Sequence, residues 1–386
     1  MKLQSVLLLV FFSFIFLNQT TLAQDAAKNS TWRELKLPNK EKSVFLEPQL
    51  LSVGSRIHMV WSGTNKSIRS PEVFHSFLDG KSEKWRAPRA PFFGKNKGRV
   101  RKIKLGRTRD LIGIMFQRSL KQGNDAYEVL LALSGDQGWE WSNTIEIDSF
   151  VAEKTGGTAL AIAGRQGTNR PEFSLAWGRE FGNIRTANFD TKSNLRPEGS
   201  AIGKYPPTAE KIEIGTLGRP GFSVIYNNGG GLSSSHVRAL VGKISEGKTF
   251  LRGQVEAFFT VASRPNGSSR MAVAIGNTLE ALTSKGKEWK KDDSQSTTLP
   301  FPNKGVSVES DVDGKKNLHL ALLRKTPGKN ELWYLGQKNK VWGKAELLHS
   351  FDDKVDMRGF DIAVSKKVIV IVASQGFQGK VFQKEL

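Results

Sequence analysis

The chain has 386 residues and a formal net charge of +21, from 58 lysines and arginines against 37 aspartates and glutamates. It contains no cysteine, which excludes disulfides and thiolate metal sites. A chain of this length can build one large core or two smaller ones, and its stability must come from that packing.

Residues 1–23 have the features of a secretory signal peptide. Lys2 precedes an apolar run from Val6 to Leu17, and small residues up to Ala23 stand where a signal peptidase cleaves. The run is about a dozen residues, whereas a membrane-spanning helix needs about 20, so a membrane anchor is the weaker interpretation. We expect residues 24–386 to form a single domain, secreted or periplasmic, with no membrane span.

The positive charge favours polyanionic partners. For an exported protein we expect acidic or sulfated polysaccharides. The sequence has no recognition helix and no aromatic-basic RNA signature, so no nucleic acid is expected. The alternative is that dispersed lysines only keep the protein soluble.

One six-residue apolar strand recurs at intervals of roughly fifty residues. Its copies are IHMVWS from Ile57, IGIMFQ from Ile112, FSLAWG from Phe173, FSVIYN from Phe222, MAVAIG from Met271, LHLALL from Leu318 and VIVIVA from Val368. Strands that are apolar on both faces suit packing between neighbouring sheets. One strand precedes each copy and another follows it, and the next turn often closes on tryptophan, as at Trp85, Trp141, Trp289 and Trp342.

Four antiparallel strands per repeat are typical of a β-propeller blade. The copies predict an all-β, seven-bladed β-propeller of four-stranded blades, with six blades as the alternative count. The last copy ends after its third strand, while TWRELKLP near the start places Trp32 where a fourth strand opens. We therefore expect the N-terminal strand to join the C-terminal blade and close the ring, which removes exposed sheet edges.

The stretch SGDQGWEW, residues 134–141, falls at the turn between the third and fourth strands of the second repeat. Asp136 can accept hydrogen bonds from backbone amides, Gly138 can adopt a positive φ, and Trp141 can pack between blades. The stretch resembles the Asp box, S-x-D-x-G-x-x-W, of sialidase-like (BNR repeat) propellers. The resemblance implies that this turn is structural and lies on the face opposite the active site.

The same resemblance argues against a standard exo-sialidase. The family's Phe-Arg-Ile-Pro motif supplies an arginine that binds the sugar carboxylate, and the matching stretch here, from Phe45 to Pro48, has Leu46 at that position. Leucine offers neither charge nor a bidentate fork. The family's nucleophilic tyrosine is not located, because neither Tyr205 nor Tyr226 stands in a recognisable motif and the other two tyrosines fall on third strands.

Ligands of propellers usually bind over the central channel, on the face built by loops between second and third strands. These loops are rich in cations that can grip carboxylate or sulfate groups. The ligand-binding candidates among them are Arg69, Arg118, Lys121, Arg179 and Arg324. Arginines are also frequent in the loops of the opposite face, so the alternative is that these loops are no more basic than the chain's average.

The fourth repeat adds Tyr226, at the end of its second strand, and His236, just before the expected third strand HVRALV. A tyrosine and a histidine beside arginines could perform β-elimination on a uronate polysaccharide. The competing interpretation is structural, since Tyr226 aligns with core aromatics of the other repeats, such as Trp61 and Phe116.

No metal and no cofactor is expected. His58 and His319 occupy the same place in two repeats, and His75 and His349 have no nearby carboxylate cluster in ligand spacing. Glycosidase chemistry needs two facing carboxylates, and nothing pairs the loop residues Asp125 and Glu180. The sequence thus predicts an exported propeller that binds acidic or sulfated glycans, with catalysis undecided. The alternatives are a polysaccharide-degrading enzyme, either a uronate lyase or a glycoside hydrolase, and a protein-interaction scaffold.

Overall fold

The computed structural model describes residues 32–38, 44–65, 68, 70–79, 84–92, 98–121, 124–151, 159–166, 171–179, 183–190, 196–204, 211–217, 221–227, 231–238, 245, 248–252, 258–293 and 296–386. The predicted signal peptide lies outside these residues. The described part of the chain contains strands and turns and no helix, and therefore no helix that could cross a bilayer.

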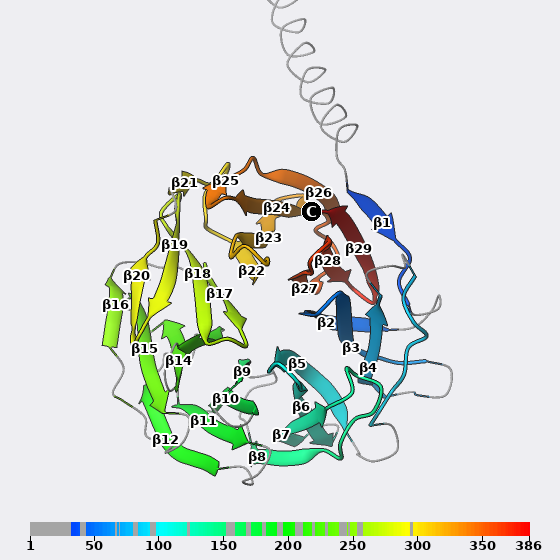
Figure 1. Ribbon diagram of the computed structural model, residues 1–386. Helices are drawn as coiled ribbons and strands as arrows, with labels where there is room; N and C mark the ends of the chain where they lie inside the picture. Colours follow the sequence, from blue (N-terminus) through cyan, green and yellow to red (C-terminus); the bar gives the residue numbers. More distant parts are fainter. Residues whose placement is uncertain are drawn as a thin grey trace, which may run out of the picture.

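Seven small antiparallel sheets surround a central axis, so the chain is a seven-bladed β-propeller, as predicted (Figure 1). In each blade the first strand lies nearest the axis and the later strands lie further out (Figure 1).

The first three blades follow one another from residue 45. Blade 1 contains β2 (Phe45–Val53), β3 (Arg56–Gly63) and β4 (Glu72–Leu78). Blade 2 contains β5 (Arg99–Arg107), β6 (Ile112–Lys121), β7 (Asn124–Ser134) and β8 (Ile145–Val151). Blade 3 contains β9 (Leu160–Gln166), β10 (Pro171–Arg179), β11 (Asn183–Asp190) and β12 (Arg196–Lys204).

The next two blades complete the far side of the ring. Blade 4 contains β13 (Ile212–Leu217), β14 (Gly221–Asn227), β15 (Gly231–Arg238) and β16 (Lys248–Arg252). Blade 5 contains β17 (Phe259–Arg264), β18 (Ser268–Ile275), β19 (Thr278–Lys285), β20 (Glu288–Lys291) and the short β21 (Thr297–Thr298).

The last two blades lead back to the start. Blade 6 contains β22 (Val306–Val312), β23 (Leu318–Thr326), β24 (Lys329–Lys338), β25 (Val341–Trp342) and β26 (Glu346–Asp352). Blade 7 contains β27 (Met357–Val364), β28 (Val368–Gln375), β29 (Gln378–Glu385) and the N-terminal β1 (Arg33–Leu35).

Three blades depart from the expected four strands, and in blade 5 the outer edge of β19 is shared by β20 and β21. In blade 1 the fourth strand is reduced to two isolated bridges, Leu78 with Trp85 and His75 with Arg89. In blade 6 the outer edge of β24 is shared by β25 and β26. In blade 4 the predicted start of the third strand was wrong. The strand begins at Gly231 and not at His236.

Blades pack through seven apolar clusters, one at each junction between neighbours. Because side chains alternate along a strand, consecutive residues of one second strand enter different clusters. Met59 packs towards blade 7 and Val60 towards blade 2. This explains why the recurring second strand is apolar on both faces.

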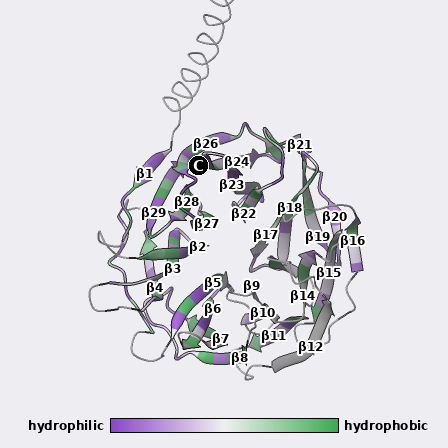
Figure 2. Cartoon of the chain, turned by 180° about the vertical axis from the view of Figure 1, so that it is seen from behind, coloured by the Kyte–Doolittle hydropathy of each residue, from purple (hydrophilic) through white to green (hydrophobic). Residues whose placement is uncertain are grey.

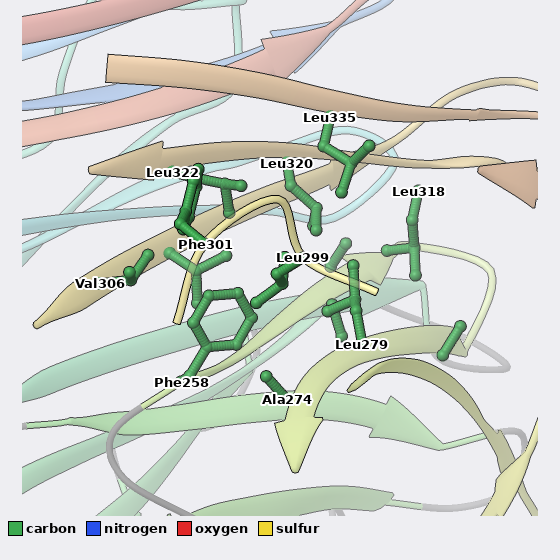
Figure 3. Packing of buried hydrophobic residues seen from close by; sticks show 14 of the residues in the cluster. Phe258, Ala274, Leu279, Leu299, Phe301, Val306, Leu318, Leu320, Leu322 and Leu335 are labelled. Carbon is green, nitrogen blue, oxygen red and sulfur yellow. The ribbon is translucent and has the colours of Figure 1, made fainter. Parts of the chain in front are cut away.

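Figure 3 shows the junction between blades 5 and 6. Phe258 comes from blade 5, and Leu320 and Leu322 come from β23 of blade 6. Leu299 and Phe301, from the connection between the two blades, lie between them. The connection is therefore part of the core that joins the blades.

The ring closes through β1. This strand pairs antiparallel with β29, with Arg33 opposite Gln383 and Leu35 opposite Val381, which confirms the predicted closure. Trp32 lies beside it and donates a hydrogen bond from Nε1 to Glu346 Oε2 of blade 6 at 2.8 Å.

The inner strands define two faces of the ring. We call the face at which they begin, near Phe45 of β2 and Arg99 of β5, the upper face, and the face at which they end, near Val53 and Arg107, the lower face. Hydrophilic and hydrophobic residues alternate along β5, which borders the central channel (Figure 2).

Candidate ligand-binding site at the channel mouth

The inner strands carry charged side chains into the central channel. On β5, Lys102 and Lys104 flank the buried Ile103. A cavity of about 270 Å³ at the upper face is lined by these lysines together with Glu47, Lys211, Glu213 and Glu309. A deeper cavity of about 130 Å³ also contacts Asp361.

Ion pairs connect these side chains across several blades. Lys211 Nζ lies 3.5 Å from Glu213 Oε1 and 3.6 Å from Glu309 Oε1. Lys104 Nζ lies 3.7 Å from the same oxygen of Glu309. The channel therefore holds a connected network of lysines and glutamates. The ion pairs fix the side chains in place, and neither positive nor negative charge is in large excess.

The network sets the protonation of its members. Burial alone would lower the pKa of Lys104, but Glu309 and the neighbouring carboxylates outweigh burial and raise it. Burial would raise the pKa of Glu309, and the two lysines beside it lower this pKa instead. For Glu213 burial prevails over Lys211, and the pKa is raised. The channel thus combines an ionised glutamate with one that holds its proton more tightly.

Asp361 has a structural function in the same channel. It accepts hydrogen bonds from the backbone amides of Leu50 at 2.7 Å and Ile362 at 2.8 Å, which joins the inner strands of blades 7 and 1. Burial, and then the charge of Glu309, raise its pKa. Asp311 joins blades 6 and 7 in the same way, by accepting the amide of Val364 at 2.7 Å.

Three neighbouring inner strands carry a β-bulge at the channel mouth. The pairing register shifts between Leu46 and Gln49 in β2, between Val100 and Lys102 in β5, and between Met357 and Gly359 in β27. Bulges re-aim side chains and occur often at the rims of barrels and beside functional sites. The residues within these bulges are Glu47, Pro48, Arg101 and Arg358.

The bulges bring arginines together on the upper face. Partial burial, and then the charges of Arg101 and Arg358, lower the pKa of Arg99, so the Arg99 guanidinium lies within electrostatic range of an arginine on its own strand and of one from blade 7. Arg358 also contacts Asp356 at 3.4 Å, and its side chain is 51% exposed. In the described part of the chain, Arg99 and Arg101 have no carboxylate within ion-pair distance. We call Arg99, Arg101 and Arg358 the arginine rim.

An aromatic side chain lies on the same face. Phe377 stands in the turn between β28 and β29 and is 60% exposed. Its carbonyl accepts the amide of Phe45, and the preceding amide, of Gly376, donates to the carbonyl of Asp356. The turn that carries Phe377 is therefore bonded to the segment that precedes Arg358. Exposed aromatic rings with nearby polar groups are common features of ligand sites.

The residues predicted from the loops do not form one site in the described structure. Arg118 is buried, with a side chain that is 6% exposed, and pairs with Glu128 on β7. Arg324 pairs with Glu331 at 3.4 Å and lies 5.0 Å from the centre of the Phe301 ring. Lys121 and Arg179 end their strands at the upper face, but their side chains, and all of Arg69, lie outside the described residues.

Tyr226 and His236 are not brought together. Tyr226 is buried in the core between blades 3 and 4 and is paired with Ser233. His236 is paired with Ser223, three residues further along β15 and nearer the lower face. Because successive side chains point to opposite sides of a sheet, the two rings lie on opposite sides of blade 4. The structural interpretation of Tyr226 thus fits its surroundings.

Among the described residues, no tyrosine lies at the channel where it could act as a nucleophile. Tyr127, Tyr226 and Tyr334 are all buried in blade junctions or sheets, and Tyr205 lies outside the described residues. Leu46, at the position of the family's arginine, directly precedes the bulge of β2. The arginines beside this bulge come from the neighbouring blades.

Sequence reasoning missed the channel residues. Their signal is the first strand of each repeat, where charged residues alternate with apolar ones, as in RKIKLGR, KIEIG and VSVESDV. In a propeller this strand lies next to the axis, so its polar positions face the channel. No cluster of side chains suited to a metal ion occurs among the described residues.

Solved structures with a similar fold include two sialidases. The Hadza microbial sialidase Hz136 superposes with a TM-score of 0.52 at 11% identity, over 89% of this chain and 66% of that one. Trypanosoma rangeli sialidase in complex with sialic acid superposes with a TM-score of 0.50 at 10% identity, over 92% of this chain and 58% of that one. No protein-family model and no curated protein matches the sequence. The chain spans at most about two thirds of these sialidases, and at such low identity the likeness shows the fold alone, that of a β-propeller.

Proposed function

We propose that the protein binds acidic or sulfated glycans over the channel mouth on its upper face. The observation that carries this proposal is the arginine rim, in which β-bulges in β5 and β27 bring guanidinium groups from two blades together. Guanidinium groups bind carboxylate and sulfate through paired, charge-assisted hydrogen bonds. Phe377 offers an apolar face for a sugar ring, and the cavity below offers further polar partners.

The rim suits an anionic ligand better than a neutral one. Like charges held near one another raise the free energy of the empty site, and an anion relieves this repulsion. The network of Lys102, Lys104 and Lys211 is already compensated by glutamates. We therefore attribute selectivity for anions to the arginine rim, while the channel side chains contribute hydrogen bonds to the ligand.

The test replaces two rim residues, Arg101→Ala together with Arg358→Ala. We expect the double variant to elute from an immobilised sulfated polysaccharide at lower salt and its Kd to rise roughly tenfold or more, because each lost charge-assisted contact is worth about 1.5 kcal/mol or more. The matched control is Arg86→Ala with Arg109→Ala, which removes the same charge from exposed positions away from the upper face. Equal weakening in both double variants would mean that only net charge matters and would refute the rim as the site.

Hydrolysis of the bound glycan is the second candidate function. Glu213 and Glu309 contact the same Lys211 ammonium, at 3.5 and 3.6 Å, so their carboxylates lie close together. Their pKa values are displaced in opposite directions, which is the pattern of an acid and a base in one site. If this pair is catalytic, sulfated or uronic polysaccharides become shorter on incubation, and Glu213→Gln stops the shortening while retention on the column persists. Intact chains that are retained identify a binding protein.

A further inference from the structure

A second charged cavity lies on the lower face, between blades 5 and 6. Its volume is about 160 Å³, whereas a single water molecule needs only roughly 10–15 Å³. Hairpin ends of the two blades supply its walls. The cationic residues that line it are Arg264, Arg270, Lys285, Lys316 and Lys340.

The positive charge of this cavity is only partly compensated. Arg270 Nη2 contacts Asp292 at 2.5 Å, and both side chains are buried. Lys340 contacts Asp293 at 3.6 Å, in a pair that is largely exposed and therefore weak. Within the described part of the chain, three lining cations have no carboxylate within ion-pair distance. They are Arg264, Lys285 and Lys316.

Two of the lysines occupy backbone positions that normally favour glycine. Lys316 has a φ of 66° and Lys340 a φ of 64°. Lys340 is the second residue of the two-residue turn between the paired Lys338 and Val341, a turn that typically has the sequence Asn-Gly. A side chain in this left-handed region costs free energy. Both positions nevertheless hold lysine, and both lysines line the same cavity, which points to a function for the side chains.

The walls of the cavity are held in place by hydrogen bonds. The amide of Lys340 donates to Asn317 Oδ1 at 3.0 Å, and Asn317 in turn donates to Asp313 Oδ2 at 2.8 Å. Arg270 donates to Gln337 Oε1 at 2.8 Å and to the carbonyl of Lys316. The lysine turns are therefore ordered before any ligand arrives, which lowers the entropy lost on binding.

We propose that this cavity binds a tetrahedral oxyanion, with Arg264, Lys316 and Lys340 as its charged partners. A sulfate or phosphate group presents oxygens in several directions and can therefore contact ammonium and guanidinium groups from both blades at once. The group can be a free inorganic anion or the sulfate ester of a sugar. The site is separate from the channel mouth, so the inference goes beyond the proposed function and does not depend on it.

The test compares sulfate binding by the wild type and by the variant Lys316→Gly with Lys340→Gly. Glycine suits both backbone positions, so we expect the variant's thermal midpoint in chloride to be unchanged or higher. Added millimolar sulfate, at ionic strength held constant with chloride, should raise the midpoint of the wild type saturably. The apparent Kd for sulfate should rise about tenfold or more in the variant. Lys315→Ala, in the same turn but away from the cavity, should bind sulfate as the wild type does.

Two results decide against the proposal. One is the same saturable sulfate shift in the double glycine variant, and the other is equal loss of the shift in Lys315→Ala. If the double variant fails to fold, the same thermal measurement on Arg264→Gln tests the proposal. An unchanged sulfate shift in that variant contradicts it. Glucose 6-sulfate then separates the two sources of the anion. A tighter Kd than that of free sulfate identifies a sulfated sugar, and an equal or weaker Kd identifies an inorganic ion, with glucose as the uncharged control.

Discussion

The buried imidazole rings of His58 and His319 show that equivalent residues of two repeats can pair with different side chains. His58 and His319 occupy equivalent positions on the second strands of blades 1 and 6. His58 Nδ1 lies 3.1 Å from His75 Nε2, and His319 Nδ1 lies 2.8 Å from the hydroxyl of Tyr334. In both blades the partner is a ring on the adjacent third strand. These histidines therefore belong to the packing of the repeat, in agreement with their equivalent positions in the sequence.

The histidine pair predicts acid sensitivity. Burial, and then the charge of Arg89, lower the pKa of His75 to about 4 from an ordinary value of 6.5. The unfolded chain binds this proton between pH 6.5 and 4 and the folded chain does not. The contribution to stability is therefore complete above pH 6.5 and is lost as the pH falls towards 4, by up to about 3 kcal/mol. His75→Gln should flatten the pH dependence of the free energy of unfolding in this window, measured by urea unfolding at several pH values.

The pKa of Glu72 is shifted in the opposite direction to that of His75, so its effect on the pH dependence of stability has the opposite sign. Burial raises its pKa to about 7 despite the nearby charge of Arg118. The folded chain thus holds this proton more tightly than the unfolded chain, so its contribution to stability is lost as the pH rises from 4.5 through 7. Glu72→Gln should change the same profile in the direction opposite to that of His75→Gln. If both variants changed the profile in the same direction, at least one of the two groups would not titrate as its burial implies.

At the scale of elements, the turn at residues 134–141 behaves as its sequence predicted. Asp136 Oδ1 accepts the Ser134 hydroxyl at 2.8 Å and the amide of Glu140 at 2.9 Å, while Gly138 has a φ of 85°. Trp141 contacts the ring of His75 in the preceding blade, with centroids 5.3 Å apart. The turn is on the lower face and joins blade 2 to blade 1.

Removal of the Asp136 carboxylate should loosen this junction. Asp136→Ala loses two hydrogen bonds, which together are worth roughly 1–3 kcal/mol, and we expect the free energy of unfolding to fall by that amount. Glu140→Ala is the matched control, because it removes the same charge from an exposed position in the same turn. Equal effects in the two variants would show that charge, and not the hydrogen bonds of the turn, accounts for the loss.

Fourth-strand tryptophans extend this pattern to other junctions. Trp289 of blade 5 donates from Nε1 to Ser223 Oγ of blade 4 at 3.1 Å. Trp342 of blade 6 packs against the cluster shared with blade 5. Each therefore contacts the blade that precedes it along the chain. The recurrence of tryptophan in the sequence reflects this repeated contact between neighbours.

At the scale of the whole molecule, stability depends on closure of the ring. Trp32 joins the last blade to blade 6 through its hydrogen bond to Glu346 and through the Tyr334 ring, whose centroid is 5.0 Å away. Leu35 on β1 enters the cluster between blades 7 and 1. The N-terminal strand thus covers the edge of β29, which would otherwise be open to pairing with another chain.

Loss of this closure should affect the whole ring. Trp32→Ala removes a part-buried indole and its hydrogen bond, and we expect a loss of about 3 kcal/mol in the free energy of unfolding. Amides of β29 should also exchange hydrogen faster than those of β14 in the same variant. Trp139→Ala, at a tryptophan that is 40% exposed and far from the closure, is the control. Unchanged exchange of β29 in Trp32→Ala would contradict a closing function for this segment.

The sequence alone predicted the ring, the number of blades and the closing strand. The reason is that a propeller repeats one local pattern, so the apolar second strand and the tryptophan turn recur visibly along the chain. The sequence alone did not predict the candidate site at the channel mouth. Lys104 and Glu309, or Arg99 and Arg358, come from different blades, and only closure of the ring brings them together. Tertiary structure also decided that Arg118 is buried in an ion pair while Arg101 is exposed at a bulge, because burial depends on neighbours that are distant in the chain.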